Sequence, residues 1–203
     1  MIYRGNEPKE FFVWVDPNDR MVRINIGMVG GLGHAPPPPE DAAPEHLLFV
    51  HNPSHRQGMV SRFHVGVIKA YSVEYDMERF RYERFREYPS RLHAMYLFET
   101  RQEAEQYRET HLDHVSTRIL KRGVTEGAYV YSLHDLNWID FLRLGHSMDA
   151  DTFNFVWRAY WSGERVSDHQ LQSFGQPWTV QPIMEALFYG RVNFPNKSLA
   201  SSD

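Results

Sequence analysis

Residues 182–192 read Pro-Ile-Met-Glu-Ala-Leu-Phe-Tyr-Gly-Arg-Val, an apolar stretch with one carboxylate, Glu185, in its first half. Apolar and aromatic residues in a short run of this kind predict a late β-strand that is mostly buried. A charged side chain in a buried strand is costly unless it is paired or used. Glu185 is therefore the first candidate for a functional residue.

A second stretch, at the opposite end of the chain, has the same character. Residues 2–5 read Ile-Tyr-Arg-Gly and predict a first strand that carries Arg4. The simpler interpretation of Arg4 alone is a strand-edge arginine that points to solvent, because charged side chains are usually exposed. This stretch by itself leaves open whether Arg4 is a surface residue or a functional one.

The middle of the chain shows helical and strand-like patterns in turn. An amphipathic helix is predicted to end at Pro89, and residues 92–98 then predict a mostly buried strand. Thr100 and Glu103 have the spacing of a capping box, which opens a helix that runs through about His111.

The following part predicts two strands and then two helices, near residues 118–124, 127–133, 135–144 and 150–161. A tight turn around Thr125-Glu126 is expected to join the strands, and Asp149 is the predicted N-cap of the second helix. The order lacks the regular alternation of a doubly wound sheet, so it indicates an α+β fold.

One domain is expected over residues 1–195, and residues 196–203 are expected to form a disordered tail. The first third is less regular, and clustered glycines and prolines make residues 27–46 a predicted loop. Prolines deny this segment the helix that a dinucleotide-binding turn requires, and no Gly-Lys-Ser/Thr follows as in a phosphate-binding loop.

Composition is compatible with a small intracellular enzyme. The 203 residues suffice to bury roughly 70% of the unfolded surface. A formal net charge of −4 gives no overall attraction to nucleic acid or membranes, and the absence of Cys excludes disulfides and thiolate catalysis. Neither a signal-peptide pattern nor an apolar run of 18 residues is present, so we expect a cytoplasmic protein without a membrane contact.

A central block completes the pattern of the two terminal stretches. It runs Pro-Ser-Arg at residues 89–91, the apolar strand, and then Ala104 and Tyr107 with small-x-x-aromatic spacing. With Tyr-Arg-Gly on the first strand and Glu185 on a late one, the chain resembles the ADP-ribosyltransferase superfamily. The Pro-Ser-Arg before an apolar strand is similar to a bacterial branch of that superfamily.

The resemblance implies a fold, a substrate and a set of site residues. The fold would be an α+β domain with a split, twisted mixed β-sheet core and flanking helices. NAD would be the substrate, no metal would be needed, and Glu185 would be catalytic. The residues that the resemblance assigns to NAD binding are Tyr3, Arg4, Gly5, Ser90, Arg91 and Tyr107.

The implied chemistry needs few residues. Cleavage of the nicotinamide–ribose bond produces an oxocarbenium-like centre, which the Glu185 carboxylate would stabilise. Arg4 would hold phosphate or ribose oxygens, and Tyr107 would stack on nicotinamide. We therefore expect Glu185 and Arg4 on adjacent strands that line one cleft. The alternatives are a Tyr107 that packs in the core, and a Ser90 and Arg91 that only cap the preceding helix.

Two features depart from the arginine-specific members of the superfamily. Those enzymes carry a glutamate two residues before the catalytic one, and this chain has Ile183 there. Their Ser-Thr-Ser triplet is also missing, unless Ser90 or Thr100 replaces it. An arginine acceptor is therefore not expected.

The resemblance thus predicts an NAD-dependent mono-ADP-ribosyltransferase that modifies a protein or nucleic acid. Small members of the superfamily are often toxins of toxin–antitoxin or antiviral defence systems, and an antitoxin would then be a partner. The alternative is a non-catalytic RNA- or protein-binding module on the same fold, which would tolerate Glu185 on the surface.

Two weaker patterns point elsewhere. His111 and His114 could place two imidazoles together, as in a metal-dependent hydrolase, but no His-Glu-x-x-His motif is present. Residues 79–86 interleave cations and aromatics as nucleic-acid surfaces do, yet the glutamates among them favour an ordinary solvated helix face.

Overall fold

The computed structural model describes residues 1–33, 62–144, 148–200 and 202, without the side chains of 62–72. Two long strands, β5 and β8, form the middle of an antiparallel sheet with the order β1-β5-β8-β3. Strand β2 also pairs with β5, and β4 also pairs with β8. The elements are β1 (Ile2–Gly5), β2 (Glu10–Val15), α1 (Arg20–Val29), β3 (Gly31–Gly33), α2 (Arg62–Arg84), β4 (Met95–Leu97), α3 (Arg101–Thr110), α4 (Leu112–Val115), β5 (Ile119–Asp135), α5 (Asn137–Arg143), α6 (Ala150–Ser162), a 3₁₀ turn (Val166–Asp168), the hairpin of β6 (Gln172–Ser173) and β7 (Gln176–Pro177), and β8 (Met184–Asn193).

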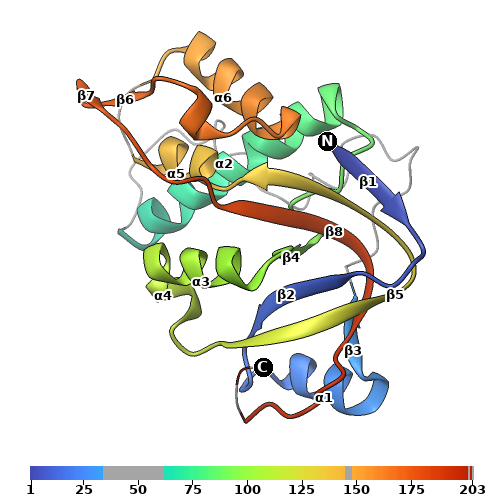
Figure 1. Ribbon diagram of the computed structural model, residues 1–203. Helices are drawn as coiled ribbons and strands as arrows, with labels where there is room; N and C mark the ends of the chain where they lie inside the picture. The colour runs from blue at the N-terminus through green and yellow to red at the C-terminus, as the bar shows by residue number, and fades with distance from the viewer. Residues whose placement is uncertain (34–61, 145–147, 201, 203) are drawn as a thin grey trace.

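A bulge divides the sheet into two halves. The pairing of β5 with β8 shifts register between Glu126 and Val130. Gly127 and Gly190 have φ values of 73° and 146°, which side chains with a Cβ rarely adopt. Strands β2 and β3 flank one half, while β1 and β4 flank the other. Both long strands curve strongly through the molecule (Figure 1).

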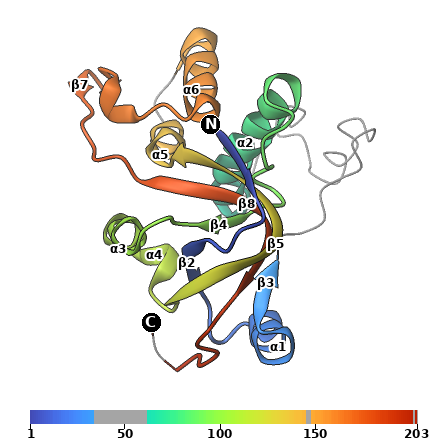
Figure 2. The ribbon, with the colours of Figure 1, turned by 45° about the vertical axis from the view of Figure 1, so that its right-hand side comes forward.

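Helices cover the sheet in separate groups. Helices α2, α5 and α6 lie above the start of β8, α3 and α4 lie below it, and α1 sits at the opposite end (Figures 1 and 2). The larger apolar core joins α5 and α6 to β8 through Trp138, Tyr160, Trp161 and Leu187. Leu187 belongs to this core, while Ala186 and Phe188 of β8 belong to a second one. Both faces of β8 are therefore packed close to Glu185, which is itself 3% exposed.

Several local predictions are confirmed. Thr100 and Glu103 form a complete capping box at the start of α3, and Asp149 caps α6 by accepting a hydrogen bond from the Thr152 amide. The α+β class is also confirmed, with a mostly antiparallel sheet beside the helices.

Other predictions are wrong. The strands expected at 118–124 and 127–133 are one strand, β5, because the glycine at 127 forms a bulge and not a hairpin turn. The strand expected at 92–98 shortens to β4, since residues 91–93 form a turn. The expected mixed sheet is antiparallel at every strand pair of the described residues.

The first third is more regular than the sequence suggested. Its glycine-rich part, predicted as a loop over 27–46, contains the end of α1 and strand β3, and residues 34–46 lie outside the described residues. Gly30 ends α1 in the left-handed conformation. In the expected tail, Leu199 packs on the core and Ser202 accepts a hydrogen bond from the Leu120 amide. Within the described chain no helix is long and apolar enough to cross a membrane.

Candidate active site

Glu185 lies at the start of β8, opposite His134 of β5, and is 3% exposed. Its Oε1 accepts hydrogen bonds from Arg91 Nη1 and from the Tyr160 hydroxyl, the latter at 2.8 Å. Burial raises the pKa of Glu185, while the neighbouring Arg91 guanidinium opposes that rise and favours the carboxylate. The charge that the sequence placed in an apolar strand is therefore buried, and it is paired.

Arg91 holds this carboxylate from the turn before β4. Its guanidinium donates to Glu74 at 2.8 and 3.1 Å and to the Tyr160 hydroxyl at 2.6 Å, besides its contact with Glu185. Its carbonyl accepts the Tyr96 hydroxyl at 2.6 Å. Burial would lower the pKa of Arg91, but Glu185 and Glu74 raise it well above its ordinary value. A planar fork of donors suits this bridging position better than an ammonium would.

Glu74 of α2 closes the network on the other side. It accepts from Arg143 of α5 at 3.0 Å as well as from Arg91. Burial alone would raise the pKa of Glu74, yet the two arginines lower it below its ordinary value. Two carboxylates and two guanidinium groups therefore form one compact, nearly neutral cluster.

The cluster borders a cavity of about 260 Å³ between the two helix groups. Aromatic rings and cations line it together with the carboxylates. The lining residues are Trp14, Glu74, Arg91, Tyr96, Phe98, Tyr107, His111, His114, Val115, Arg118, Leu136, Arg143 and Glu185. Titratable groups that converge on one cavity are typical of a functional site.

Tyr160 of α6 is held in place by a buried histidine. The His134 ring stacks on the Tyr160 ring at 4.5 Å, and its Nδ1 lies 2.7 Å from the Tyr160 carbonyl. Its Nε2 lies 2.7 Å from Ser132 Oγ. Burial lowers the pKa of His134 to about 3, so this imidazole is neutral near pH 7. His134 thus fixes the ring whose hydroxyl bonds Glu185.

Asp135 fixes the backbone that leads into β8. Its carboxylate accepts the amides of Asn137, Val166 and Ile183 at 2.9 to 3.1 Å. Burial raises the pKa of Asp135, and these hydrogen bonds oppose the rise. The Asp135 carboxylate therefore anchors the backbone at Ile183, two residues before Glu185.

The first strand does not reach the cavity. Arg4 pairs with Glu87 at 3.4 Å on the surface, where its side chain is 64% exposed. Tyr3 stacks on Tyr131 at 4.7 Å, and a Cβ at Gly5 would lie 2.6 Å from the Tyr129 hydroxyl. Strand β5 separates β1 from β8, so the expected adjacency of the Arg4 and Glu185 strands is wrong.

The residues of the central block differ in their roles: Ser90 has a structural role, and Tyr107 lies at the cavity. Ser90 Oγ accepts the Leu92 amide at 3.1 Å, and the Ser90 amide donates to the Tyr189 hydroxyl, so Ser90 shapes the turn outside the cavity lining. Tyr107 lines the cavity, and its ring stacks on His111 at 4.3 Å. Of the seven residues that the resemblance assigned, the cavity brings together Arg91, Tyr107 and Glu185.

Five charged or aromatic residues of this site were not predicted from the sequence: Glu74, Tyr96, Arg118, Arg143 and Tyr160. Tyr160 sits on the apolar face of α6, where an aromatic residue is normally read as core. Glu74 and Arg143 look like helix-surface charges along the chain. Only the packing of α2 against α5 turns them inward.

The histidine pair lies at the same cavity. His111 Nε2 is 2.9 Å from Asp140 Oδ2, and His114 Nδ1 is 3.1 Å from the Tyr107 hydroxyl. Among the residues described, no three His, Asp or Glu side chains are close enough to hold a metal ion. Each of these histidines therefore has a polar side chain within hydrogen-bond distance at the cavity.

The cation–aromatic stretch of α2 has a structural use. Arg81 is buried and donates to both carboxylate oxygens of Glu78, at 2.8 and 3.0 Å. It also donates to the carbonyls of Arg86 and Tyr88, both at 3.0 Å. Arg81 thus satisfies carbonyls beyond the helix end, as basic residues near a C-terminus often do.

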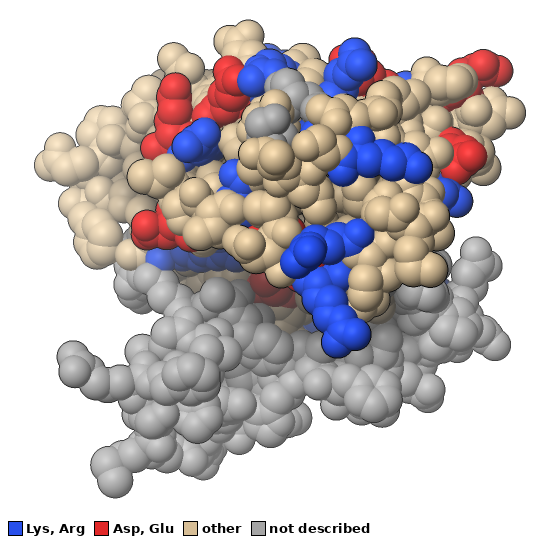
Figure 3. Space-filling model, turned by 90° about the horizontal axis from the view of Figure 1, so that it is seen from below, with Lys and Arg blue, Asp and Glu red and all other residues tan. Residues whose placement is uncertain are grey.

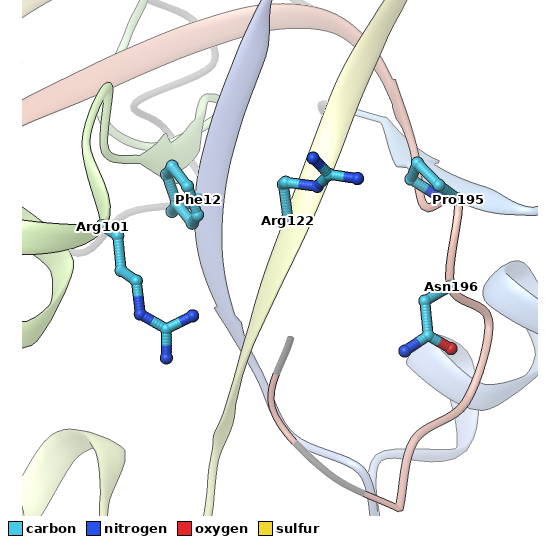
Figure 4. A pocket seen from close by; sticks show the side chains of 5 residues that line it. All are labelled: Phe12, Arg101, Arg122, Pro195 and Asn196. Atoms are coloured by element: carbon cyan, nitrogen blue, oxygen red, sulfur yellow. The ribbon is translucent and has the colours of Figure 1, made fainter.

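A second and larger hollow, of about 640 Å³, lies elsewhere. Figure 4 shows Arg101 and Asn196 on opposite sides of it, with Arg122 of β5 between them. Arg101 pairs with Glu105 at 2.7 Å and Arg122 with Glu10 at 3.2 Å. Charge on the face seen from below is also unevenly distributed. Figure 3 shows Lys and Arg in several groups on this face, with most Asp and Glu toward its rim. The described residues that line this larger hollow include no carboxylate, and its arginines pair with glutamates on the surface, so the Glu185 cavity is the stronger candidate for catalysis.

The chain matches a model of a known protein family. A family model described as "Protein of unknown function (DUF2441)" matches residues 45–174, which is more than half of the chain. Glu74, Arg91 and Tyr160 fall inside the matched region, and Glu185 lies beyond its end. No curated protein matches the chain.

Proposed function

The chain belongs to the DUF2441 family, and we propose that it is an NAD-dependent mono-ADP-ribosyltransferase whose chemistry takes place at Glu185. The observation that supports this proposal best is a buried, doubly hydrogen-bonded carboxylate on a central strand at the edge of a cavity. A carboxylate held so firmly is suited to stabilise a positive charge that develops on a bound substrate. A non-catalytic binding module would tolerate this glutamate on the surface.

The fold is compatible with this function. The bulge at residues 126–130 bends the antiparallel sheet into two halves, as a split and twisted core requires. Glu185 begins the strand that runs through both halves. We therefore propose that the chain has an ADP-ribosyltransferase-like fold.

Cavity size suits one end of the dinucleotide. A volume of about 260 Å³ is slightly below the roughly 300 Å³ at which drug-sized pockets begin. Nicotinamide and its ribose would fill the cavity, and the remainder of NAD would extend through the opening. Tyr107 or Tyr96 would offer a ring face to nicotinamide.

The proposed reaction is cleavage of the nicotinamide–ribose bond followed by attack of an acceptor on the ribose carbon C1′. Arg91 and Tyr160 both bond Oε1 of Glu185, so in the described part of the chain Oε2 is the oxygen left for the ribose. The cations that would meet phosphate oxygens are Arg118 and Arg143, which line the cavity, and not Arg4. Position 183 carries a buried isoleucine, so no second carboxylate stands two residues before Glu185 for an arginine acceptor.

Replacing Glu185 by Gln tests the proposal. The substitution keeps shape and removes the negative charge, so nicotinamide release from NAD should fall by about 10² to 10³. NAD affinity should change much less, because stacking and the arginines would provide most of the binding. Arg4→Gln, on an exposed arginine outside the cavity, is the matched control and should release nicotinamide at the parental rate. An equal rate in Glu185→Gln and wild type would refute the assignment of Glu185.

A further inference from the structure

We propose that His114 is the general base that removes a proton from the acceptor, which makes the acceptor a neutral nucleophile such as a hydroxyl group. This inference rests on the proposed transfer reaction. It adds a residue and a class of acceptor to it.

Glu185 is poorly placed to take the acceptor's proton. Its carboxylate is buried, it is engaged with Arg91 and Tyr160, and it would face the ribose. A macromolecular acceptor must approach from solvent. The proton acceptor should therefore be an exposed group at the opening of the same cavity.

His114 of α4 meets these requirements. Its side chain is exposed, and it lines the cavity together with Glu185. Its Nδ1 is 3.1 Å from the Tyr107 hydroxyl oxygen. When Nδ1 carries the proton and donates it to that oxygen, Nε2 keeps the lone pair that a base needs.

Neighbouring residues fix the orientation of this imidazole. The Tyr107 ring stacks on His111 at 4.3 Å, and His111 Nε2 is 2.9 Å from the Asp140 carboxylate. Asp140 therefore holds His111, the His111 ring supports the Tyr107 ring, and the Tyr107 hydroxyl bonds His114, the group that would accept the proton. Two hydrogen bonds and one ring stack therefore hold this imidazole in a fixed orientation, as a positioned base requires.

The charges around His114 favour its neutral form. Burial lowers the pKa of His114, and the neighbouring His111, Arg143 and Arg118 lower it further, against an opposing effect of Asp140. A histidine with a pKa below its ordinary value of 6.5 is largely unprotonated at pH 7 and can accept a proton.

The step balances without a further reactant. The bond between C1′ and the nicotinamide nitrogen breaks, and its electron pair leaves with nicotinamide. The acceptor oxygen forms a new bond to C1′, and its proton passes to His114 Nε2. A carboxylate or other anionic acceptor would need no such base.

The test compares two small nucleophiles with NAD, methanol as a neutral acceptor and azide as an anionic one. In His114→Gln the formation of O-methyl-ADP-ribose should fall by about 10² or more, the usual contribution of a general base. The azide product should fall far less, because azide has no proton to lose. The wild-type methanol rate should rise with pH through the His114 pKa and then level off, and the variant should lose this rise. His93→Gln, a histidine outside the cavity lining, is the control.

The outcomes separate the two proposals. Equal losses with methanol and azide would reduce His114 to a positioning residue and overturn the inference, as would no loss with either. In Glu185→Gln the formation of both the methanol and the azide product should fall, because Glu185 would act in cleavage of the nicotinamide–ribose bond. A wild-type protein that releases no nicotinamide with any nucleophile would refute the proposed function and the inference with it.

Discussion

Arg91 and Arg4 were both candidate NAD-binding cations, but in the folded chain Arg91 is buried and Arg4 is exposed. Arg91 is 5% exposed and bonds Glu74, Tyr160 and Glu185. Arg4 is a surface residue whose single described ion pair, with Glu87, spans 3.4 Å. A buried pair carries a large penalty when it is broken, whereas an exposed pair contributes little. The same residue type therefore has a different energetic weight in the two regions.

The largest expected effect comes from Arg91→Met, which breaks the buried cluster. It leaves Glu185 and Glu74 without their shared cation, so the free energy of unfolding should fall by about 3 to 5 kcal/mol. Urea denaturation followed by tryptophan fluorescence measures this as a lower midpoint at constant slope. A loss below about 1 kcal/mol, the range of exposed pairs, would mean that water reaches the cluster.

Glu74→Gln should have the next largest effect, and this effect should depend on pH. Loss of its charge-assisted hydrogen bonds to Arg91 and Arg143 should lower the free energy of unfolding by about 2 to 3 kcal/mol at pH 7. The lowered pKa of Glu74 means that its stabilisation is present above the ordinary value of 4.5 and is lost as pH falls through the native pKa. Denaturation at pH 7 and at pH 3 should therefore show wild type and variant converging in acid. A gap that widens in acid would contradict the lowered pKa.

Tyr160→Phe should have an intermediate effect at the same cluster. It removes the hydroxyl between Arg91 and Glu185 but leaves those two in contact, so the unfolding free energy should fall by about 1.5 kcal/mol. The rate of nicotinamide release should fall as well, since the carboxylate loses one of its two hydrogen bonds. Thermal unfolding and a nicotinamide assay measure the two effects. Unchanged stability would show that a water molecule replaces the hydroxyl.

Arg4→Ala should have the smallest effect of all. Removal of an exposed pair should change the unfolding free energy by less than about 0.5 kcal/mol, and less still in high salt. Its apparent NAD requirement should stay at the wild-type value. A several-fold rise in that requirement would bring Arg4 back as a NAD-binding residue and erase the contrast with Arg91.

Local signals in the sequence predicted local structure well. The capping box of Thr100 and Glu103, the Asp149 cap and the late strand with Glu185 all depend on neighbours within a few residues. The glycine at 127 suits a tight turn as well as a bulge, and only the pairing of β5 with β8 decides between the two geometries. Strand β3 lies in a glycine-rich segment that resembles a loop, and only its pairing with β8 makes it a strand.

By itself, the sequence determined that Glu185 would be a charge inside a strand, because an apolar run must be buried and the carboxylate must go with it. It also placed Arg91 just before a strand and Tyr107 in the helix that follows that strand. Only the tertiary structure decided which cation Glu185 meets. The insertion of β5 between β1 and β8 sends Arg4 to the surface, while the turn before β4 carries Arg91 to the carboxylate. Ion pairs between distant segments depend on strand order and helix packing, and neither leaves a mark in the residues that form the pair.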